Sequence, residues 1–424
     1  MKVLVIGSGG REHALVWKLS RSPSVTRIYA APGSDAIGRL ARCVDIQVND
    51  IEALASFAHR ERIDLTMVGP EEPLICGVVD LFQSKGLPIV GPTAAAARLE
   101  GSKAFSKQLM KKYGIPSADF RVAKTVAEAR NAIKEIGIPL VIKADGLAAG
   151  KGVILCYTPE EADFAIQQMM VDKFFGPAGD QVIIEQLLTG EEASFIALTD
   201  GRTVVPMASS QDHKRAFDND EGPNTGGMGA YSPAPVVNDS IHLRIMEEVM
   251  APIVEAMEAE GCPFSGVLYA GLMIKNNKPS ILEFNCRFGD PETQPIMVRL
   301  RSDLGKLLMA TANGKLDQVR VDWNPRPAVC VVMASGGYPG SAKKGYPISG
   351  IESVENMDDL VVFHAGTKLV DGQWTNHGGR VLGVTGVGDT IEKAIAKAYA
   401  GVNGITWQDA QFRKDIAHRA LGRM

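Results

Sequence analysis

The first part of the chain alternates short apolar runs with amphipathic segments. Residues 2–6 form a nearly continuous apolar run, typical of a strand buried on both faces of a parallel sheet, and residues 11–19 place apolar positions at helical spacing. Further apolar runs at residues 25–30, 65–68 and 88–90 lead into turns rich in glycine and proline. This alternation predicts a doubly wound parallel α/β sheet, which binds ligands at the carboxyl ends of its strands.

The turn after the first run is a glycine-rich loop, residues 7–10 (Gly-Ser-Gly-Gly). Backbone N–H groups and a helix dipole favour an anion at such a place, so the loop predicts a phosphate site, with a tight turn that binds nothing as the alternative. A nicotinamide dinucleotide is not expected, because the third glycine of its motif would fall at Glu12. The second strand also lacks a following acidic residue for a ribose, since Ala-Pro-Gly stands at residues 31–33.

The central part of the chain carries a glycine-rich connection beside an apolar strand. Residues 139–144 predict a strand whose only charge is Lys143, and residues 145–152 (Asp-Gly-Leu-Ala-Ala-Gly-Lys-Gly) follow it. This connection is not a P-loop, because no helix and no serine or threonine follow its Gly-Lys pair. Two interpretations stay open: a loop that folds over a triphosphate through its backbone and Lys151, or a simple hairpin.

Two later stretches, residues 209–215 and 222–231, are polar, and the second is dense in glycine; both predict irregular loops. Long loops inside a compact domain are usually functional or disordered, and the low charge of the second favours an ordered substrate loop. Residues 240–260 then predict a long amphipathic helix, followed by a buried strand at residues 266–274.

The next predicted strand, residues 280–285, carries two polar side chains in an apolar run. Side chains at positions i and i+2 of a strand share a face, so Glu283 and Asn285 lie together while Leu282 and Phe284 bury on the other face. A carboxylate in such a strand is costly unless a cation meets it. Two hard oxygen donors of this kind suit Mg²⁺, which also takes waters and nucleotide phosphates as ligands.

Arg287 follows this strand, and its planar guanidinium suits a carboxylate or a phosphate. It also offers an alternative to the metal, because an internal ion pair of Glu283 with Arg287 or Arg299 would neutralise the same carboxylate. The spacing of the residues leaves both alternatives open.

The last part of the chain follows a predicted linker at residues 325–327 (Pro-Arg-Pro). Strands are predicted at residues 328–334, 361–364, 368–370 and 380–385, and a helix at residues 390–399. No catalytic residue stands out there. Core or surface roles are expected for His364, His377 and Arg380, with a position facing the cleft as the alternative.

The length and composition of the chain limit the classes of function that it can have. A length of 424 residues predicts about three domains. The net charge of −4 comes without a basic block, so nucleic-acid binding is not expected, and no apolar run approaches the roughly 18 residues of a membrane span. The six cysteines have no Cys-x-x-Cys spacing and predict free thiols in a reducing cytosol, hence a cytoplasmic protein.

Residues 283–294 read Glu-Phe-Asn-Cys-Arg-Phe-Gly-Asp-Pro-Glu-Thr-Gln. This segment resembles the signature of the glycinamide ribonucleotide synthetase (phosphoribosylamine–glycine ligase) family of the ATP-grasp superfamily, and the resemblance extends over essentially the whole chain. It implies a Rossmann-like substrate domain over residues 1–102 and an ATP-grasp domain over residues 103–325, with a mobile lid at about residues 120–190. A small α+β domain over residues 326–424 would complete the substrate site.

The resemblance also implies the site residues. Nucleotide-binding residues would be Lys103, Lys143, Gly150, Lys151, Gly152, Glu185, Gln186, Leu188 and Glu192. Substrate-binding residues would be Gly9, Gly10, Glu71, Asp212, Lys214 and Arg287. Arg287, Lys143 and Lys151 would act in catalysis, and Glu283 and Asn285 would hold Mg²⁺ or Mn²⁺.

The reaction implied by the resemblance joins glycine to 5-phosphoribosylamine with ATP, through a glycyl phosphate, in de novo purine biosynthesis. Another ATP-grasp carboxylate–amine ligase is the alternative. A ligase that makes an acyl phosphate needs electrostatic stabilisation more than an added base, so no general-base role is expected for His213 beside Asp212. A monomer or weak homodimer is expected.

Overall fold

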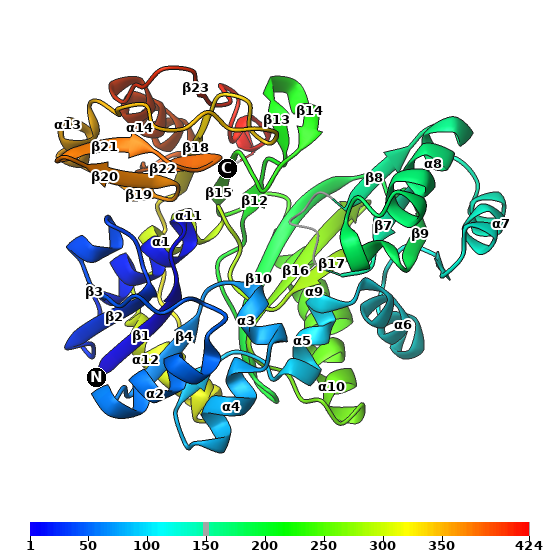
Figure 1. Cartoon of the computed structure of the whole chain (residues 1–424), viewed down its shortest axis with the longest axis horizontal. Helices are drawn as coiled ribbons and strands as arrows, with labels where there is room; N and C mark the ends of the chain where they lie inside the picture. The colour runs from blue at the N-terminus through cyan, green and yellow to red at the C-terminus, as the bar shows by residue number, and fades with distance from the viewer. Residues whose placement is uncertain (147–151, 424) are drawn as a thin grey trace.

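The computed structural model describes residues 1–146 and 152–423, which build several sheets (Figure 1). The N-terminal sheet is parallel, with its strands in the order β3-β2-β1-β4-β5, as the sequence predicts. Its strands are β1 (Lys2–Gly7), β2 (Arg27–Pro32), β3 (Arg42–Cys43), β4 (Leu65–Val68) and β5 (Ile89–Val90). Its helices are α1 (Gly10–Leu19), α2 (Ile51–Glu61), α3 (Glu71–Ile75), α4 (Val78–Ser84) and α5 (Ala94–Gly101), with the short η1 (Ile37–Arg39).

A second sheet forms a separate lobe at the right of Figure 1, joined to the rest through α6 (Lys103–Tyr113). Its strand order is β6-β9-β7-β8, and its apolar side chains form a small core of their own. The strands are β6 (Phe120–Ala123), β7 (Leu140–Ala144), β8 (Val153–Cys156) and β9 (Val182–Gln186). The lobe's helices are α7 (Val126–Ile136), α8 (Pro159–Ile166), η2 (Gln167–Val171) and η3 (Gly176–Gly179).

The central sheet, in the order β11-β10-β16-β17, shares one apolar core with the N-terminal domain. Its strands are β10 (Glu191–Asp200), β11 (Val204–Pro206), β16 (Ser265–Lys275) and β17 (Lys278–Asn285). The predicted long helix is continuous through a π turn, as α9 (Asp239–Ile245), η5 (Met246–Met250) and α10 (Ala251–Ala259). Beyond the central sheet follow α11 (Thr293–Arg299), α12 (Leu304–Ala312) and η6 (Leu316–Gln318).

The C-terminal sheet has the order β12-β15-β18-β22-β19, with β23 also paired to β18. Its strands are β12 (Gln211–Asp212), β15 (Gly229–Ser232), β18 (Ala328–Ser335), β19 (Leu360–His364), β22 (Arg380–Val387) and β23 (Ala410–Gln411). Helices α13 (Ile351–Glu355) and α14 (Ile391–Gly404), the hairpin β20 (Thr367–Val370) with β21 (Gln373–Asn376), and η7 (His418–Ala420) complete it. The strands and the helix predicted after the linker are therefore confirmed.

The prediction of irregular loops at residues 209–215 and 222–231 is wrong. These residues form β12 and β15, which join the C-terminal sheet, and a hairpin of β13 (Arg215–Phe217) and β14 (Glu221–Asn224) around η4 (Asp218–Asp220). The glycines hide the strand pattern, because Gly229 pairs with Val331 where an added Cβ would lie 2.7 Å from the Cys330 carbonyl oxygen. Local composition cannot show that such a segment finds its partner strand roughly a hundred residues away.

None of the helices in the described ranges has the length and apolar content needed to cross a membrane. All six cysteines are free thiols, in agreement with the prediction from their spacing.

One close backbone approach joins the N-terminal domain to the central sheet. Gly266 at the start of β16 has φ +128°, and an added Cβ would lie 2.8 Å from the Gly91 Cα after β5. A side chain there would meet both backbone strain and a backbone clash, because residues other than glycine rarely adopt this conformation.

We expect Gly266→Ala to lower the free energy of unfolding by about 3 kcal/mol, since strain of roughly 1–3 kcal/mol adds to overpacking of similar size. Gly261→Ala is the matched control: its φ is +73° and no atom lies within 4 Å of the added Cβ. The control should lose only about 1 kcal/mol. Urea denaturation followed by circular dichroism measures both, and equal losses would contradict the close approach.

Candidate active site

A cavity of about 540 Å³ lies where the domains meet. Its walls come from the N-terminal domain, the lobe of β6–β9, the central sheet and the C-terminal sheet. The charged residues that line it are Arg11, Glu71, Glu100, Lys103, Lys107, Lys143, Glu185, Glu192, Asp212, Lys214, Arg215, Glu283, Arg287, Asp290, Glu292 and Arg380. This density of charge in one enclosed space marks it as the candidate active site.

The end of β17 brings Glu283 and Asn285 into this cavity, as the spacing predicts. The prediction for Leu282 is wrong, because it is only half-buried at the cavity wall, whereas Phe284 is buried in the apolar core although it also lines the cavity. The cause is a bulge: Glu283 pairs with Gly271 and Ile281 pairs with the next residue of β16, which leaves Leu282 without a partner in the ladder.

Glu283 has no hydrogen bond or ion pair within the described part of the chain. Burial raises its pKa, but Lys214, Lys103 and Lys143 outweigh this effect and hold the pKa below the usual range of a glutamate. The alternative ion pair is not formed, since Arg287 bonds to other carboxylates and Arg299 donates to Ser232 and to backbone carbonyls. An ionised carboxylate beside an amide oxygen fits a divalent cation.

Two buried lysines meet one glutamate on the lobe side of the cavity. Glu185 on β9 forms ion pairs with Lys107, at 2.5 Å, and with Lys143, which also donates to the Leu282 carbonyl at 3.0 Å. Burial raises the pKa of Glu185, and the two lysines lower it further than burial raises it. Lys107 was missed from the sequence, where it is one of several lysines on α6.

The remaining residues implied for the nucleotide lie around this group. Lys103 donates to the Gly146 carbonyl at 3.0 Å, and burial lowers its pKa. Gln186, Leu188, Glu192 and Gly152 line the cavity. Gly150 and Lys151 lie outside the described residues.

Arg287 is bonded on two sides of its guanidinium group. Its Nε donates to Glu71 at 3.1 Å and its Nη2 donates to Glu100 at 3.0 Å. Burial raises the pKa of Glu100, whereas Arg287 and Arg11 hold the pKa of Glu71 below its usual range despite burial. Glu100 was missed from the sequence; the signal is a lone carboxylate in an alanine-rich helix that the fold buries.

The glycine-rich loop at residues 7–10 is occupied by the side chain of Glu12. The Gly9 N–H donates to the Glu12 carboxylate at 2.7 Å, and the same side chain lies so close to Gly7 that an added Cβ there would be 2.4 Å from the Glu12 Cγ and 2.6 Å from its Cδ. Gly10 packs against Gln294. Glu12, which excludes the dinucleotide motif in the sequence, therefore takes the position expected for a phosphate.

The strand at Asp212 faces a second group of carboxylates. Lys214 forms an ion pair with Glu192 at 3.0 Å. The Glu292 carboxylate accepts hydrogen bonds from the Tyr269 hydroxyl at 2.8 Å and from the Ser194 hydroxyl at 3.0 Å. Burial raises the pKa of Asp212 to about 7, with Glu292 and Glu192 adding to the rise and Lys214 opposing it. Glu292 belongs to the signature segment, but the sequence alone gave it no role.

His213 lies away from the cavity, as expected for a residue without a catalytic role. It is fully buried, and its Nε2 accepts a hydrogen bond from the Ala417 N–H at 3.0 Å. Burial lowers its pKa to about 3, so the ring is neutral at physiological pH.

Family models match three successive parts of this arrangement. They are the phosphoribosylglycinamide synthetase N domain over residues 1–100, the ATP-grasp (A) domain over residues 101–293 and the C domain over residues 328–419. The chain belongs to the phosphoribosylglycinamide synthetase family. The predicted family, the three-domain ATP-grasp fold and the enzyme class, a ligase that forms a C–N bond, are therefore confirmed.

Curated relatives agree with this family over their full lengths. The chain is 53% identical to a phosphoribosylamine–glycine ligase of Ralstonia nicotianae, covering 100% of both chains. It is 54% identical to that of Escherichia coli K12, covering 100% of this chain and 99% of the relative.

Solved structures show the same architecture. The phosphoribosylamine–glycine ligase of Thermotoga maritima has a TM-score of 0.86 at 33% identity, covering 98% of this chain and 100% of that one. The biotin carboxylase domain of a Hydrogenobacter thermophilus 2-oxoglutarate carboxylase, solved with magnesium ADP and bicarbonate, shares the fold at 16% identity (TM-score 0.72, covering 97% of this chain and 91% of that one).

The raised pKa of Asp212 predicts an acidic limb in the pH dependence of kcat/KM. Below about pH 7 the carboxyl becomes protonated, so the wild-type rate should fall about tenfold per pH unit. Asp212→Asn should be slower and should lose this limb. Asp290→Asn is the matched control, because Arg380 holds the pKa of Asp290 below its usual range despite burial, so the limb near pH 7 should remain. An unchanged limb in Asp212→Asn would contradict the assignment.

Proposed function

We propose that this chain joins glycine to 5-phosphoribosylamine with ATP, giving glycinamide ribonucleotide, ADP and phosphate through a glycyl phosphate. The observation that carries the proposal is the pair Glu283 and Asn285 in the central cavity. Among the described residues their side chains have no hydrogen-bond or ion-pair partner, and lysines surround Glu283. The shared activity of relatives that match the whole chain supports the choice of substrates. The site of reaction is proposed to be cytoplasmic and the protein a monomer or weak homodimer.

The triphosphate of ATP is proposed to lie between the lobe and the end of β17. Lys103 and Lys143 would contact its phosphates, and the backbone of Glu185–Leu188 would bind the adenine. Glu283 and Asn285 would hold Mg²⁺ or Mn²⁺, which draws charge from the γ-phosphate when bound. No group of three or more His, Cys, Asp or Glu side chains forms a metal cage within the described ranges, so the remaining ligands would be waters and phosphate oxygens.

Glycine is proposed to bind beside Arg287. Of the two carboxylates on this arginine, Glu71 has 29% of its side-chain surface exposed and Glu100 only 8%. An incoming glycine carboxylate would therefore displace Glu71 and leave Glu100 in place. Glu71 would then face the cavity as an anion, suited to a substrate amine.

The proposed chemistry has two steps. A glycine carboxylate oxygen attacks the γ-phosphorus, and the bond between that phosphorus and the β-bridging oxygen breaks to release ADP. The phosphoribosylamine nitrogen then attacks the acyl carbon, the bond from this carbon to the phosphate oxygen breaks, and the nitrogen loses a proton. Asp212, whose pKa burial raises to about 7, would accept this proton. Closure of the lobe would exclude water from the acyl phosphate.

Glu283→Gln should lower the rate of ADP release by about 100-fold and raise the Mg²⁺ concentration needed, because a neutral amide replaces the charged ligand. A coupled ADP assay over a Mg²⁺ titration measures both. Glu248→Gln is the control, since Glu248 pairs with Arg244 on the α9–η5 helix. Near-normal turnover of Glu283→Gln at saturating Mg²⁺ would contradict the metal assignment.

Arg287→Lys should raise the KM for glycine about tenfold and leave the KM for ATP unchanged, because a point charge replaces a planar fork. The measurement is steady-state ADP release with each substrate varied in turn, with thermal unfolding to confirm that the variant folds. Bicarbonate and formate in place of glycine test the alternative ligase. Equal rises in both KM values would count against the role of Arg287.

A further inference from the structure

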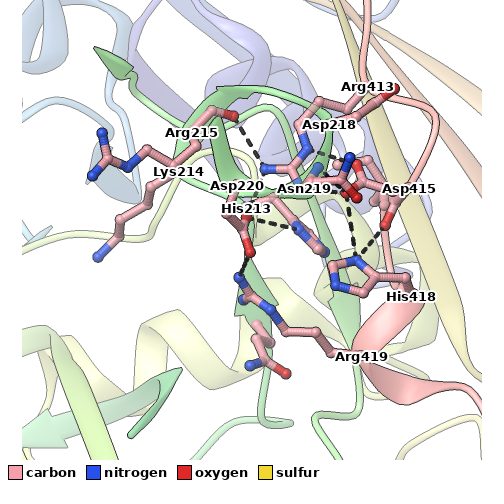
Figure 2. A network of polar contacts seen from close by, with 12 residues as sticks. His213, Lys214, Arg215, Asp218, Asn219, Asp220, Arg413, Asp415, His418 and Arg419 are labelled. Atoms are coloured by element: carbon pink, nitrogen blue, oxygen red, sulfur yellow. Dashed lines mark hydrogen bonds and ion pairs between the residues drawn. The ribbon is translucent and has the colours of Figure 1, made fainter. Parts of the chain in front are cut away.

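The C-terminal segment, residues 411–423, returns from α14 to the hairpin β13–β14 at the edge of the cavity. Figure 2 shows a dense polar cluster between the two. At its centre is Arg413, whose side chain is fully buried. Neither the reaction nor the signature segment accounts for a fully buried arginine at this place.

The guanidinium group of Arg413 donates hydrogen bonds to two carboxylates and to one backbone carbonyl. Its Nε and Nη2 each donate to Asp415 at 2.7 Å, in a parallel fork. Its Nη1 donates to Asp220 at 2.9 Å and to the Arg215 carbonyl at 3.2 Å. Removing one member of such a group leaves uncompensated buried charge, so the pairs fix a single arrangement of segment and hairpin.

Further bonds hold the tip of the hairpin. The Asn219 N–H donates to Asp415 at 2.9 Å, and the Lys414 N–H donates to Asp218 at 2.7 Å. Asn219 and Asp220 have φ values of 59° and 57°, the left-handed pair of a tight hairpin turn, which asparagine and aspartate tolerate better than most residues other than glycine. The C-terminal segment therefore holds the turn from both sides, at Asp218 and at Asn219.

The face of the strand that meets this segment is opposite to the face that meets the cavity. His213 accepts the hydrogen bond from Ala417, while its neighbours Asp212 and Lys214 line the cavity. The residues on either side of His213 face the cavity, so fixing His213 and the Arg215 carbonyl restrains the direction of Asp212 and Lys214. Alternation ends at Arg215, the first residue of β13, whose side chain also lines the cavity. Figure 2 shows the side chains of Lys214 and Arg215 extending away from the cluster.

We propose that Arg413 is a positioning residue for the ligase reaction: through Asp220 and the Arg215 carbonyl it holds the Asp212–Lys214 strand in the geometry that the substrates require. This inference rests on the proposed function of the cavity. Arg413 itself lies outside the cavity, so its effect passes entirely through the hairpin.

Arg413→Gln in the full chain tests this role. At saturating substrates kcat should fall about 10- to 100-fold, because a misplacement of about 1 Å costs about 100-fold. The KM for ATP should change less than kcat, since Glu192, which pairs with Lys214, is one of several residues proposed to bind the nucleotide. Hydrogen exchange should become faster in residues 211–227 and stay unchanged in β16 and β17. Arg326→Gln is the matched control, because it removes an arginine paired with Asp359 in the same domain and should change none of these values.

Asp220→Asn serves as the milder variant where Arg413→Gln does not fold, since it keeps the shape of the side chain and removes one charge. Its kcat should fall about tenfold with the same local pattern of exchange. Wild-type kcat in a folded Arg413→Gln or Asp220→Asn protein would overturn the proposal, as would a uniform rise of exchange over the whole chain. A wild-type chain without glycine-dependent ADP release would refute the proposed function instead, and the local exchange would still show whether Arg413 holds the hairpin β13–β14.

Discussion

Matching of charges inside the central cavity is the constraint on which the arrangement of the domains depends. Arg287 at the end of the central sheet meets Glu71 and Glu100 of the N-terminal domain, and Glu185 of the lobe meets Lys107 of α6. Such pairs add little net stability, because desolvation offsets their attraction, but losing one partner costs about 3–5 kcal/mol. The pairs therefore select one alignment of the domains. Glu283 is the exception, because its neighbours are cations held by other residues.

Much of the fold could be predicted because it depends on local periodicity. The parallel sheet follows from apolar runs such as residues 2–6, and the helix before β16 follows from its amphipathic spacing. The positions of Glu283 and Asn285 were predicted from the two-residue repeat of a strand, although the bulge at Leu282 was not. A bulge depends on which residues pair across the ladder, and nothing in one strand's composition shows that.

The rest of the site could not be predicted because it depends on contacts between distant segments. Glu100 becomes a site residue only because α5 packs beside the end of β17, and its 186-residue separation from Cys286 carries no local signal. Glu12 shows the opposite case. The sequence identifies it as an interruption of a motif, but only the fold shows its carboxylate bonded to the Gly9 N–H. The phosphoribosylamine contacts expected at Gly9 and Gly10 stay predictions.

The pairing of β15 with β18 affects whether the C-terminal domain can be expressed as a fragment or exchanged between relatives by recombination. Strands β12 and β15 precede the linker at residues 325–327 by roughly a hundred positions, yet they complete the sheet that follows it. A fragment beginning after the linker would leave residues 328–331 of β18 without their partner strand, while β23 would still pair with the end of β18. An unprotected edge of this kind is an aggregation hazard. Recombination at that linker between distant relatives would separate strands that must match in register. The linker divides the polypeptide, but the domain it introduces cannot be exchanged as an independent unit.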